Sequence, residues 1–216
     1  MAIAAAKRRA MTILVLGPVR SGKSARAAAL ARATGEPVIF AATAAIDWDD
    51  AEMRERVARH RRDRPADWTV VETAAPEGPS LTALLRESAA GSCILVDALG
   101  TWIAAQLFEW REWAEQDAVA TLDALDARGA ELVAALRETR ATVVVVAEET
   151  GWGVVPVSPV GRLFRDALGR LVQRIAEEAE RVELVVAGYA IDLRAIGARV
   201  ADVRFTGGSP PEGHRR

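Results

Sequence analysis

The sequence predicts a single α/β domain in which a mostly parallel sheet is flanked by helices on both sides. Short apolar runs rich in β-branched residues alternate with longer segments of helical periodicity, and no repeat or long linker divides the chain. Nearly all of these runs lack polar/apolar alternation, as expected of strands covered on both faces. Half of the 216 residues are hydrophobic, which excludes wholesale disorder. We assign residues 12–205 to this domain, 1–11 to an N-terminal extension and 206–216 to a disordered tail.

The predicted strands are the short apolar runs, and the predicted helices are the longer segments between them. The strands are Thr12–Leu16, Val38–Ala42, Trp68–Glu72, Cys93–Val96, Thr142–Ala147 and Val182–Ala187. The helices are Gly22–Thr34, Asp50–Arg62, Leu81–Ala89, Thr101–Trp113, Asp117–Arg137 and Val160–Glu180. Pro65 enforces the end of the second helix, and the turn PEGPS precedes the third.

Composition excludes several classes of protein. Lys and Arg total 28 against 30 Asp and Glu, so the net charge of -2 gives no general attraction to nucleic acid or acidic lipid. The single cysteine, Cys93, cannot form an internal disulfide or a zinc cluster. No run reaches the roughly 18 apolar residues of a membrane span, and the first residues lack the charge order of a signal peptide. We expect a soluble, cytoplasmic protein.

The strongest motif is GPVRSGKS, which fits G-x-x-x-x-G-K-[ST] between the first predicted strand and the first predicted helix. Its residues are Gly17, Pro18, Val19, Arg20, Ser21, Gly22, Lys23 and Ser24. Glycines let the backbone curl so that N–H groups face an anion, and the helix N-terminus adds partial positive charge. Lys23 would reach the β/γ-phosphates and the Ser24 hydroxyl would bind Mg²⁺. Because the chain has only one other lysine, Lys7, the motif favours a P-loop NTPase-like site over an ordinary glycine turn.

A second constellation is His60 in an arginine-rich segment, EMRERVARHRRDRPADW. Neighbouring guanidinium groups lower the pKa of an imidazole and keep it unprotonated. An unprotonated imidazole is a nucleophile toward phosphorus, and the arginines would neutralise the triphosphate under attack. The alternative, that His60 only ends a solvent-exposed charged helix, fits the residues equally well. His214, in the tail, is expected to be inert.

The motifs GPVRSGKS, EMRERVARHRRDRPADWTVVE, ILVDALGTWI, EETGWGVVP and FRDALGRLVQR follow one another from Thr12 to Gly188. This succession resembles the bifunctional adenosylcobinamide kinase / adenosylcobinamide-phosphate guanylyltransferase family of cobalamin biosynthesis. The resemblance implies a P-loop α/β domain that assembles as a homotrimer. It also implies two reactions: phosphorylation of adenosylcobinamide by ATP or GTP, then transfer of GMP from GTP through a guanylylated histidine to give adenosylcobinamide-GDP.

The resemblance also implies the residues of the site. His60 takes the position of the guanylylated histidine, and Lys23 is the second catalytic residue. Beyond the loop, the implied nucleotide contacts are Ala42, Thr43, Ala44, Arg61, Arg62, Asp63, Arg64, Glu72 and Asp97. Asp97 ends an apolar strand, where a carboxylate that binds Mg²⁺ with Ser24 belongs; the alternative is that it caps the following helix.

The sequence departs from the family pattern at Glu148-Glu149, Ala105, Val172 and Pro18-Val19. Because the phosphate-binding residues are retained while several polar positions are lost, these departures bear on corrinoid binding and the kinase reaction more than on nucleotide binding. Two other functions therefore stay open: a different P-loop small-molecule kinase in which His60 is only structural, and a non-catalytic nucleotide-binding protein.

Overall fold

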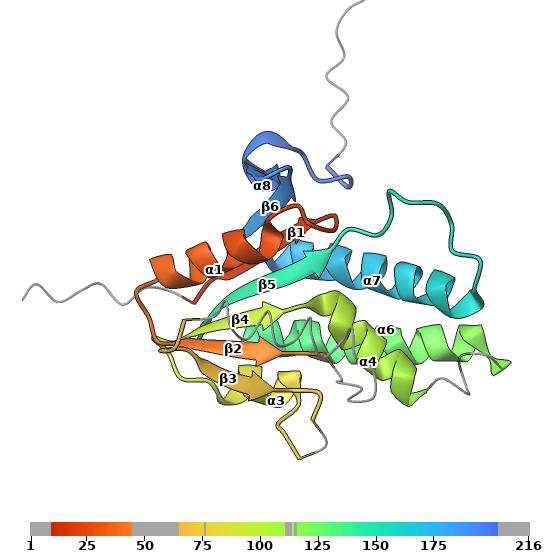
Figure 1. The fold of residues 1–216 in the computed structure, drawn as a ribbon, viewed down its shortest axis with the longest axis horizontal. Helices are drawn as coiled ribbons and strands as arrows, with labels where there is room; N and C mark the ends of the chain where they lie inside the picture. The colour runs from red at the N-terminus through yellow and green to blue at the C-terminus, as the bar shows by residue number, and fades with distance from the viewer. Residues whose placement is uncertain (1–9, 45–64, 76, 111–113, 115, 203–216) are drawn as a thin grey trace, which may run out of the picture.

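The computed structural model describes residues 10–44, 65–75, 77–110, 114 and 116–202. Within them the strands form one sheet in the order β3-β2-β4-β5-β1-β6-β7 (Figure 1). The strands are β1 (Thr12–Gly17), β2 (Val38–Ala42), β3 (Thr69–Glu72), β4 (Cys93–Asp97), β5 (Thr142–Glu148), β6 (Arg181–Val186) and β7 (Tyr189–Asp192). All neighbours pair in parallel except β6 and β7, which form an antiparallel hairpin. The predicted mostly parallel sheet is confirmed.

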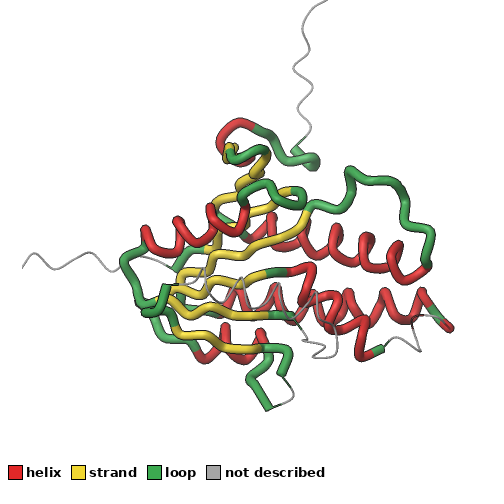
Figure 2. The backbone as a smooth tube through the Cα atoms, in the orientation of Figure 1, coloured by secondary structure: helices red, strands yellow, loops and turns green. Residues whose placement is uncertain are grey.

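Helices cover both faces of this sheet (Figures 1 and 2). They are α1 (Lys23–Ala33), α3 (Leu81–Glu87), α4 (Leu99–Glu109), α6 (Ala118–Glu138), α7 (Pro159–Glu178) and α8 (Leu193–Ile196). The predicted helix Asp50–Arg62 lies outside the described residues. The strand β7 and the short helix α8 were not predicted.

Two hydrophobic cores lie on opposite sides of the sheet because side chains alternate along each strand. Ile13 and Val15 of β1 are buried on the face that α1 covers, with Ala27 of that helix. Leu14, between them, is buried on the other face with Leu168 of α7. The helices α3, α4, α6 and α7 supply most of this second core. The central strands β1, β4 and β5 are therefore buried and apolar on both faces, which explains the absence of alternation in their sequences.

Most helices begin where the sequence supplies a capping residue. The side chains of Ser80, Asp117 and Ser158 accept hydrogen bonds from backbone N–H groups at the starts of α3, α6 and α7. Pro159 takes the first helical position of α7, where a missing N–H costs nothing. The helix α1 is different, because its N-cap is Gly22, which has no side chain.

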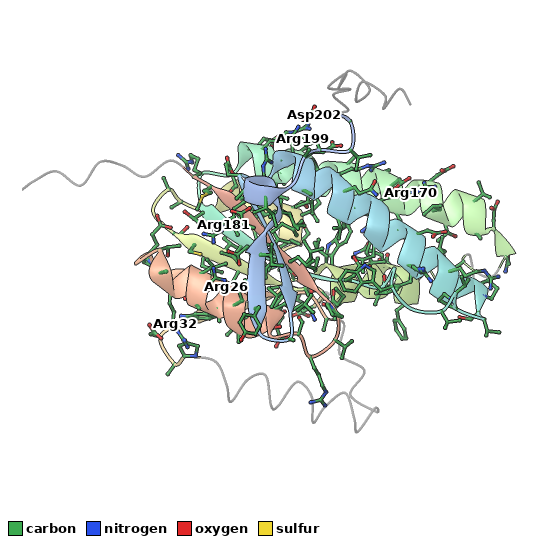
Figure 3. All side chains as sticks on the ribbon, turned by 90° about the horizontal axis from the view of Figure 1, so that it is seen from above. Arg26, Arg32, Arg170, Arg181, Arg199 and Asp202 are labelled. Atoms are coloured by element: carbon green, nitrogen blue, oxygen red, sulfur yellow. The ribbon has the colours of Figure 1, made fainter. Side chains whose placement is uncertain are left out.

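A buried carboxylate connects α1 to the sheet. Glu183 of β6 is only 1% exposed, and Arg26 of α1 binds it through Nε at 2.7 Å and Nη2 at 2.9 Å. Arg181 adds a second guanidinium 2.5 Å from Oε1; Figure 3 labels Arg26 and Arg181. The hydrogen bond to Glu183 raises the pKa of Arg26. The start of α1 is thus held against β6 by a bidentate ion pair.

Candidate active site

The carboxyl ends of five strands meet at one edge of the sheet. Gly17 pairs with Glu148, so β1 and β5 end level with each other. Ala42 pairs with both Asp97 and Glu72, so β4 and β3 end level with β2. The crevice outside the carboxyl ends of parallel strands is where α/β proteins bind ligands. The topology therefore brings the phosphate loop and the two predicted carboxylates to the same edge.

The loop between β1 and α1 has the backbone that an anion site needs. Arg20 has φ 58° and Gly22 has φ 99°, both in the left-handed region, and these conformations curl the chain. Gly22 offers no side-chain cap, and the first turn of α1 carries no acidic residue. The helix N-terminus therefore keeps its partial positive charge for a ligand. Lys23 Nζ donates a hydrogen bond to the Pro18 carbonyl at 3.4 Å, which holds its ammonium at the loop.

Packing explains why the motif begins with glycine. A Cβ on Gly17 would overlap the Val185 carbonyl of β6 and approach the Ser21 hydroxyl. Ser21 is 4% exposed, and its Oγ accepts a hydrogen bond from Lys23 N at 3.3 Å. Ser21 therefore supports the loop from inside, and a larger residue at position 17 would displace it.

Two backbone hydrogen bonds fix the loop from outside. Glu149 N donates to the Gly17 carbonyl at 3.0 Å, at the end of β5. Gly188 N, in the turn of the β6–β7 hairpin, donates to the Ser21 carbonyl at 2.9 Å. Gly188 has φ 82°, which suits glycine. Strands on both sides of β1 thus hold the loop in shape.

Thr43 connects the end of β2 to the end of β4. It is 1% exposed, and its hydroxyl hydrogen-bonds the Ala98 carbonyl and the Thr101 hydroxyl, each at 2.6 Å. Thr43 N also donates to the Asp97 carbonyl at 3.4 Å. These contacts place Ala42, Thr43 and Ala44 at the same edge of the sheet. The Thr43 hydroxyl is already hydrogen-bonded within the protein.

Asp97 does not cap the next helix. The N-cap of α4 is Ala98, and Asp97 is the last residue of β4. Asp97 is half-buried at the strand end, the position at which P-loop proteins place a carboxylate that binds Mg²⁺. Glu72 is half-buried at the corresponding position of β3.

Glu148, the last residue of β5, is a site residue that sequence reasoning did not assign. Its Oε2 accepts a hydrogen bond from Gly100 N at 2.8 Å, which caps α4 from another strand. Burial raises the pKa of Glu148; the Gly100 hydrogen bond and the charge of Lys23 oppose this shift, and the charge of Asp97 adds to it. The available signal was its place at the end of an apolar strand, the same signal that identified Asp97.

A cavity of about 660 Å³ opens beside Thr43. The other walls come from α3, α4, α6 and the segment after β3, and include Thr73, Trp102 and Gln106. Its volume suits a small molecule or part of a larger one.

The described part of the chain contains no group of three or more His, Cys, Asp or Glu residues that could hold a metal ion on its own. Mg²⁺ does not require one, because it keeps several waters and binds one or two protein oxygens together with substrate phosphates. A hydroxyl from Ser24 and a carboxylate from Asp97 are oxygen ligands of that kind.

Among the described helices, none has the length and apolar character to span a membrane.

The predicted residues divide into two groups. The structure brings the phosphate loop, Ala42–Ala44, Glu72 and Asp97 to one edge of the sheet. The catalytic role of Lys23 and the contacts of these residues with nucleotide stay predictions. His60 and the following residues Arg61, Arg62, Asp63 and Arg64 lie outside the described residues.

The fold and the phosphate loop define a P-loop nucleotide-binding protein of the α/β class. The family model described as "Cobinamide kinase / cobinamide phosphate guanyltransferase" matches residues 13–193. The chain belongs to this family, which confirms the resemblance inferred from its motifs.

Curated relatives agree with this assignment. The chain is 39% identical over 185 residues to the bifunctional adenosylcobalamin biosynthesis protein CobP of Pseudomonas aeruginosa, covering 85% of this chain and 98% of the relative. It is 35% identical over 187 residues to the protein CobU of Escherichia coli, covering 85% of this chain and 100% of the relative.

Among solved structures, a RadB recombinase matches with a TM-score of 0.42 at 14% identity, covering 82% of this chain and 74% of the other.

Proposed function

We propose that this chain is a bifunctional transferase that catalyses two successive reactions. In the first reaction the γ-phosphate of ATP or GTP passes to the hydroxyl of adenosylcobinamide. In the second, GTP guanylylates His60 with loss of pyrophosphate, and the GMP passes to the new phosphate to give adenosylcobinamide-GDP. The observation that carries the proposal is the intact phosphate loop in a chain of the cobinamide kinase / guanyltransferase family.

The phosphate loop supports the triphosphate-binding part of the proposal. Arg20 and Gly22 are left-handed and curl the loop, a conformation in which successive backbone N–H groups can face one anion, and the start of α1 has no side-chain cap. The Lys23 ammonium would neutralise charge on the β/γ-phosphates as the γ-phosphoryl group leaves. Positioning and charge stabilisation are most of what a protein supplies to phosphoryl transfer.

Mg²⁺ is the proposed metal, bound with the nucleotide. Ser24, in the first turn of α1, and Asp97, at the end of β4, would hold it. Bound there, the metal would neutralise charge on the phosphates. Glu72 and the turn Ala42–Ala44 are proposed to contact the nucleotide beyond the phosphates.

The guanylylation step rests on His60 and its arginine-rich surroundings. The residues Arg61, Arg62, Asp63 and Arg64 are proposed to contact the nucleotide, with the guanidinium groups neutralising the phosphates next to the attacking imidazole. The attack forms a phosphoramidate bond between the imidazole and the α-phosphorus, and pyrophosphate leaves.

Labelling with α-³²P-GTP and Mg²⁺ tests this function. We expect a covalent protein adduct that is labile in acid and stable in base, as a phosphoramidate is. The chain has two histidines, so His214→Ala is a matched control that should keep the label, while His60→Ala should lose it. His60→Ala should still phosphorylate adenosylcobinamide. Absence of label from the wild-type protein, or its retention in His60→Ala, would refute the proposed guanylyl-histidine.

We also propose that the protein works as a homotrimer. Exposed apolar side chains on the β6–β7 hairpin, Tyr189 and Ile191, support self-association, because β7 is an unpaired edge of the described sheet. Sedimentation equilibrium measures the mass directly, and a monomer at micromolar concentration would contradict the trimer.

A further inference from the structure

Glu148 lies at the edge of the sheet where the phosphate loop begins, because it pairs with Gly17 in the register of β1 and β5. It ends β5, the strand between β1, which leads into the phosphate loop, and β4, which ends in Asp97. The charges of Lys23 and Asp97 both act on its carboxylate: the lysine lowers the pKa of Glu148 and the aspartate raises it. Because the lysine of such a loop reaches the β/γ-phosphates, a group beside it lies beside the phosphoryl group that is transferred.

We propose that Glu148 is a catalytic residue of the phosphorylation step, where its carboxylate accepts the hydrogen bond of the attacking hydroxyl and takes its proton. This inference rests on the proposed function. The alcohol oxygen forms a bond to the γ-phosphorus while the bond from that phosphorus to the β–γ bridging oxygen breaks. The nucleoside diphosphate leaves with the electron pair of the broken bond, and the hydroxyl proton passes to Glu148.

Neighbouring residues hold Glu148 in a defined position. Gly100 N donates to Oε2 at 2.8 Å, and a Cβ at Gly100 would overlap this oxygen, so the close approach depends on glycine. A carboxylate has a second oxygen, so the bond to Gly100 leaves it able to accept another hydrogen bond. Burial also raises the pKa of Glu148, which makes its carboxylate a stronger proton acceptor.

The two proposed reactions differ in their need for a base. In the first reaction the attacking group is an alcohol, which is fully protonated at neutral pH. The second transfers GMP to a phosphate monoester, which has already lost its second proton above about pH 6. A residue that serves only as a proton acceptor should therefore matter to the first reaction and not to the second.

The variant Glu148→Gln tests this difference. Glutamine keeps an oxygen that can accept from Gly100 N, so the cap on α4 is retained while the base is removed. Phosphorylation of adenosylcobinamide is measured with GTP, and guanylyl transfer is measured separately from GTP to preformed adenosylcobinamide phosphate. We expect kcat of phosphorylation to fall by about 100-fold or more, while the rate of guanylyl transfer should change far less. Glu87→Gln, at the exposed end of α3, is the matched control and should change neither reaction.

The outcomes separate the inference from the proposed function. Equal loss of both reactions in Glu148→Gln would show that Glu148 only supports the fold of the site, and full phosphorylation would show that no carboxylate is needed; either overturns the inference. Glu148→Asp, which keeps a carboxylate, should recover part of the phosphorylation, and it decides the matter if the glutamine variant does not fold. Failure of the wild-type protein to phosphorylate adenosylcobinamide would instead refute the proposed function.

Discussion

Glu148 at the end of β5 and Gly100 in the first turn of α4 fit each other closely: Oε2 accepts a hydrogen bond from Gly100 N at 2.8 Å, and a Cβ at position 100 would occupy the place of that oxygen. The Glu148 side chain, from β5, thus accepts a hydrogen bond from a backbone N–H at the start of α4, the helix that follows β4. The contact relates the end of β5, beside the phosphate loop, to the segment that follows Asp97. Substitutions at either residue should therefore lower kcat of the phosphorylation reaction.

Gly100→Ala should displace the Glu148 carboxylate without unfolding the protein. The overlapping atom is the end of a flexible side chain, and alanine favours a helix over glycine by up to about 1 kcal/mol. If Glu148 is the base, we expect kcat of phosphorylation to fall about tenfold and guanylyl transfer to remain. Gly169→Ala, on the exposed face of α7 with open space around it, is the control. Wild-type phosphorylation by Gly100→Ala would show that the close contact is unimportant.

Lys23→Arg should lose triphosphate binding although it keeps the charge. A guanidinium is a planar fork, and the narrow loop around Lys23 suits a compact ammonium. Isothermal calorimetry with GTP and Mg²⁺ measures the effect, and we expect no detectable heat of binding. Lys7→Arg, the same change at the only other lysine, should bind as the wild-type protein does. An unchanged Kd for Lys23→Arg would contradict the proposed contact with the phosphates.

Arg26→Ala should destabilise the folded protein, because it removes two hydrogen bonds from Glu183, which is 1% exposed. Arg181 still pairs with this carboxylate, so we expect a loss of about 2 kcal/mol in the free energy of unfolding rather than the full cost of an unpaired buried charge. Urea unfolding measures it. Arg86→Ala, which breaks an exposed pair with Glu138, should cost less than about 1 kcal/mol. Equal losses of unfolding free energy in Arg26→Ala and Arg86→Ala would mean that Arg181 alone is sufficient to compensate the buried charge of Glu183.

Cys93 should be unreactive in the folded protein. It is 0% exposed at the start of β4, and burial raises the pKa of its thiol to about 11. At pH 8 only about one thiol in a thousand would then be the reactive thiolate. A disulfide reagent followed by absorbance should therefore react slowly with native protein and fully in urea. Reaction of the native protein within the mixing time would show that this part of the sheet opens readily.

The phosphate loop, the parallel sheet and most helix starts were predictable because they depend on local patterns: G-x-x-x-x-G-K-S, apolar runs and capping residues. The hairpin partner β7 was missed because Tyr189–Asp192 is largely exposed and its apolar run, Tyr189–Ile191, is shorter than those of most predicted strands. Its turn also begins with Ala187 at φ 51°, a left-handed residue that no turn pattern identifies.

Glu148 was missed as a site residue for a different reason. Its importance follows from the strand order, since β5 lies between β1 and β4, and strand order depends on contacts between distant segments. The sequence showed that Glu148 follows an apolar run and departs from the family pattern, but it did not show which strands lie beside that run. Asp97 also follows an apolar run, and it was assigned because it matches an acidic position of the family pattern. The prediction for His60 lies outside the described residues and stays a prediction.

The hydrogen bond from Gly188 to the Ser21 carbonyl has a practical consequence for shortening the chain. A fragment that stops after α7 would keep every residue of the motif GPVRSGKS. It would nevertheless lose β6, the neighbour of β1, together with the amide that steadies the loop from that side. The smallest piece able to retain GTP should therefore extend through Asp192, some 170 positions beyond the motif itself.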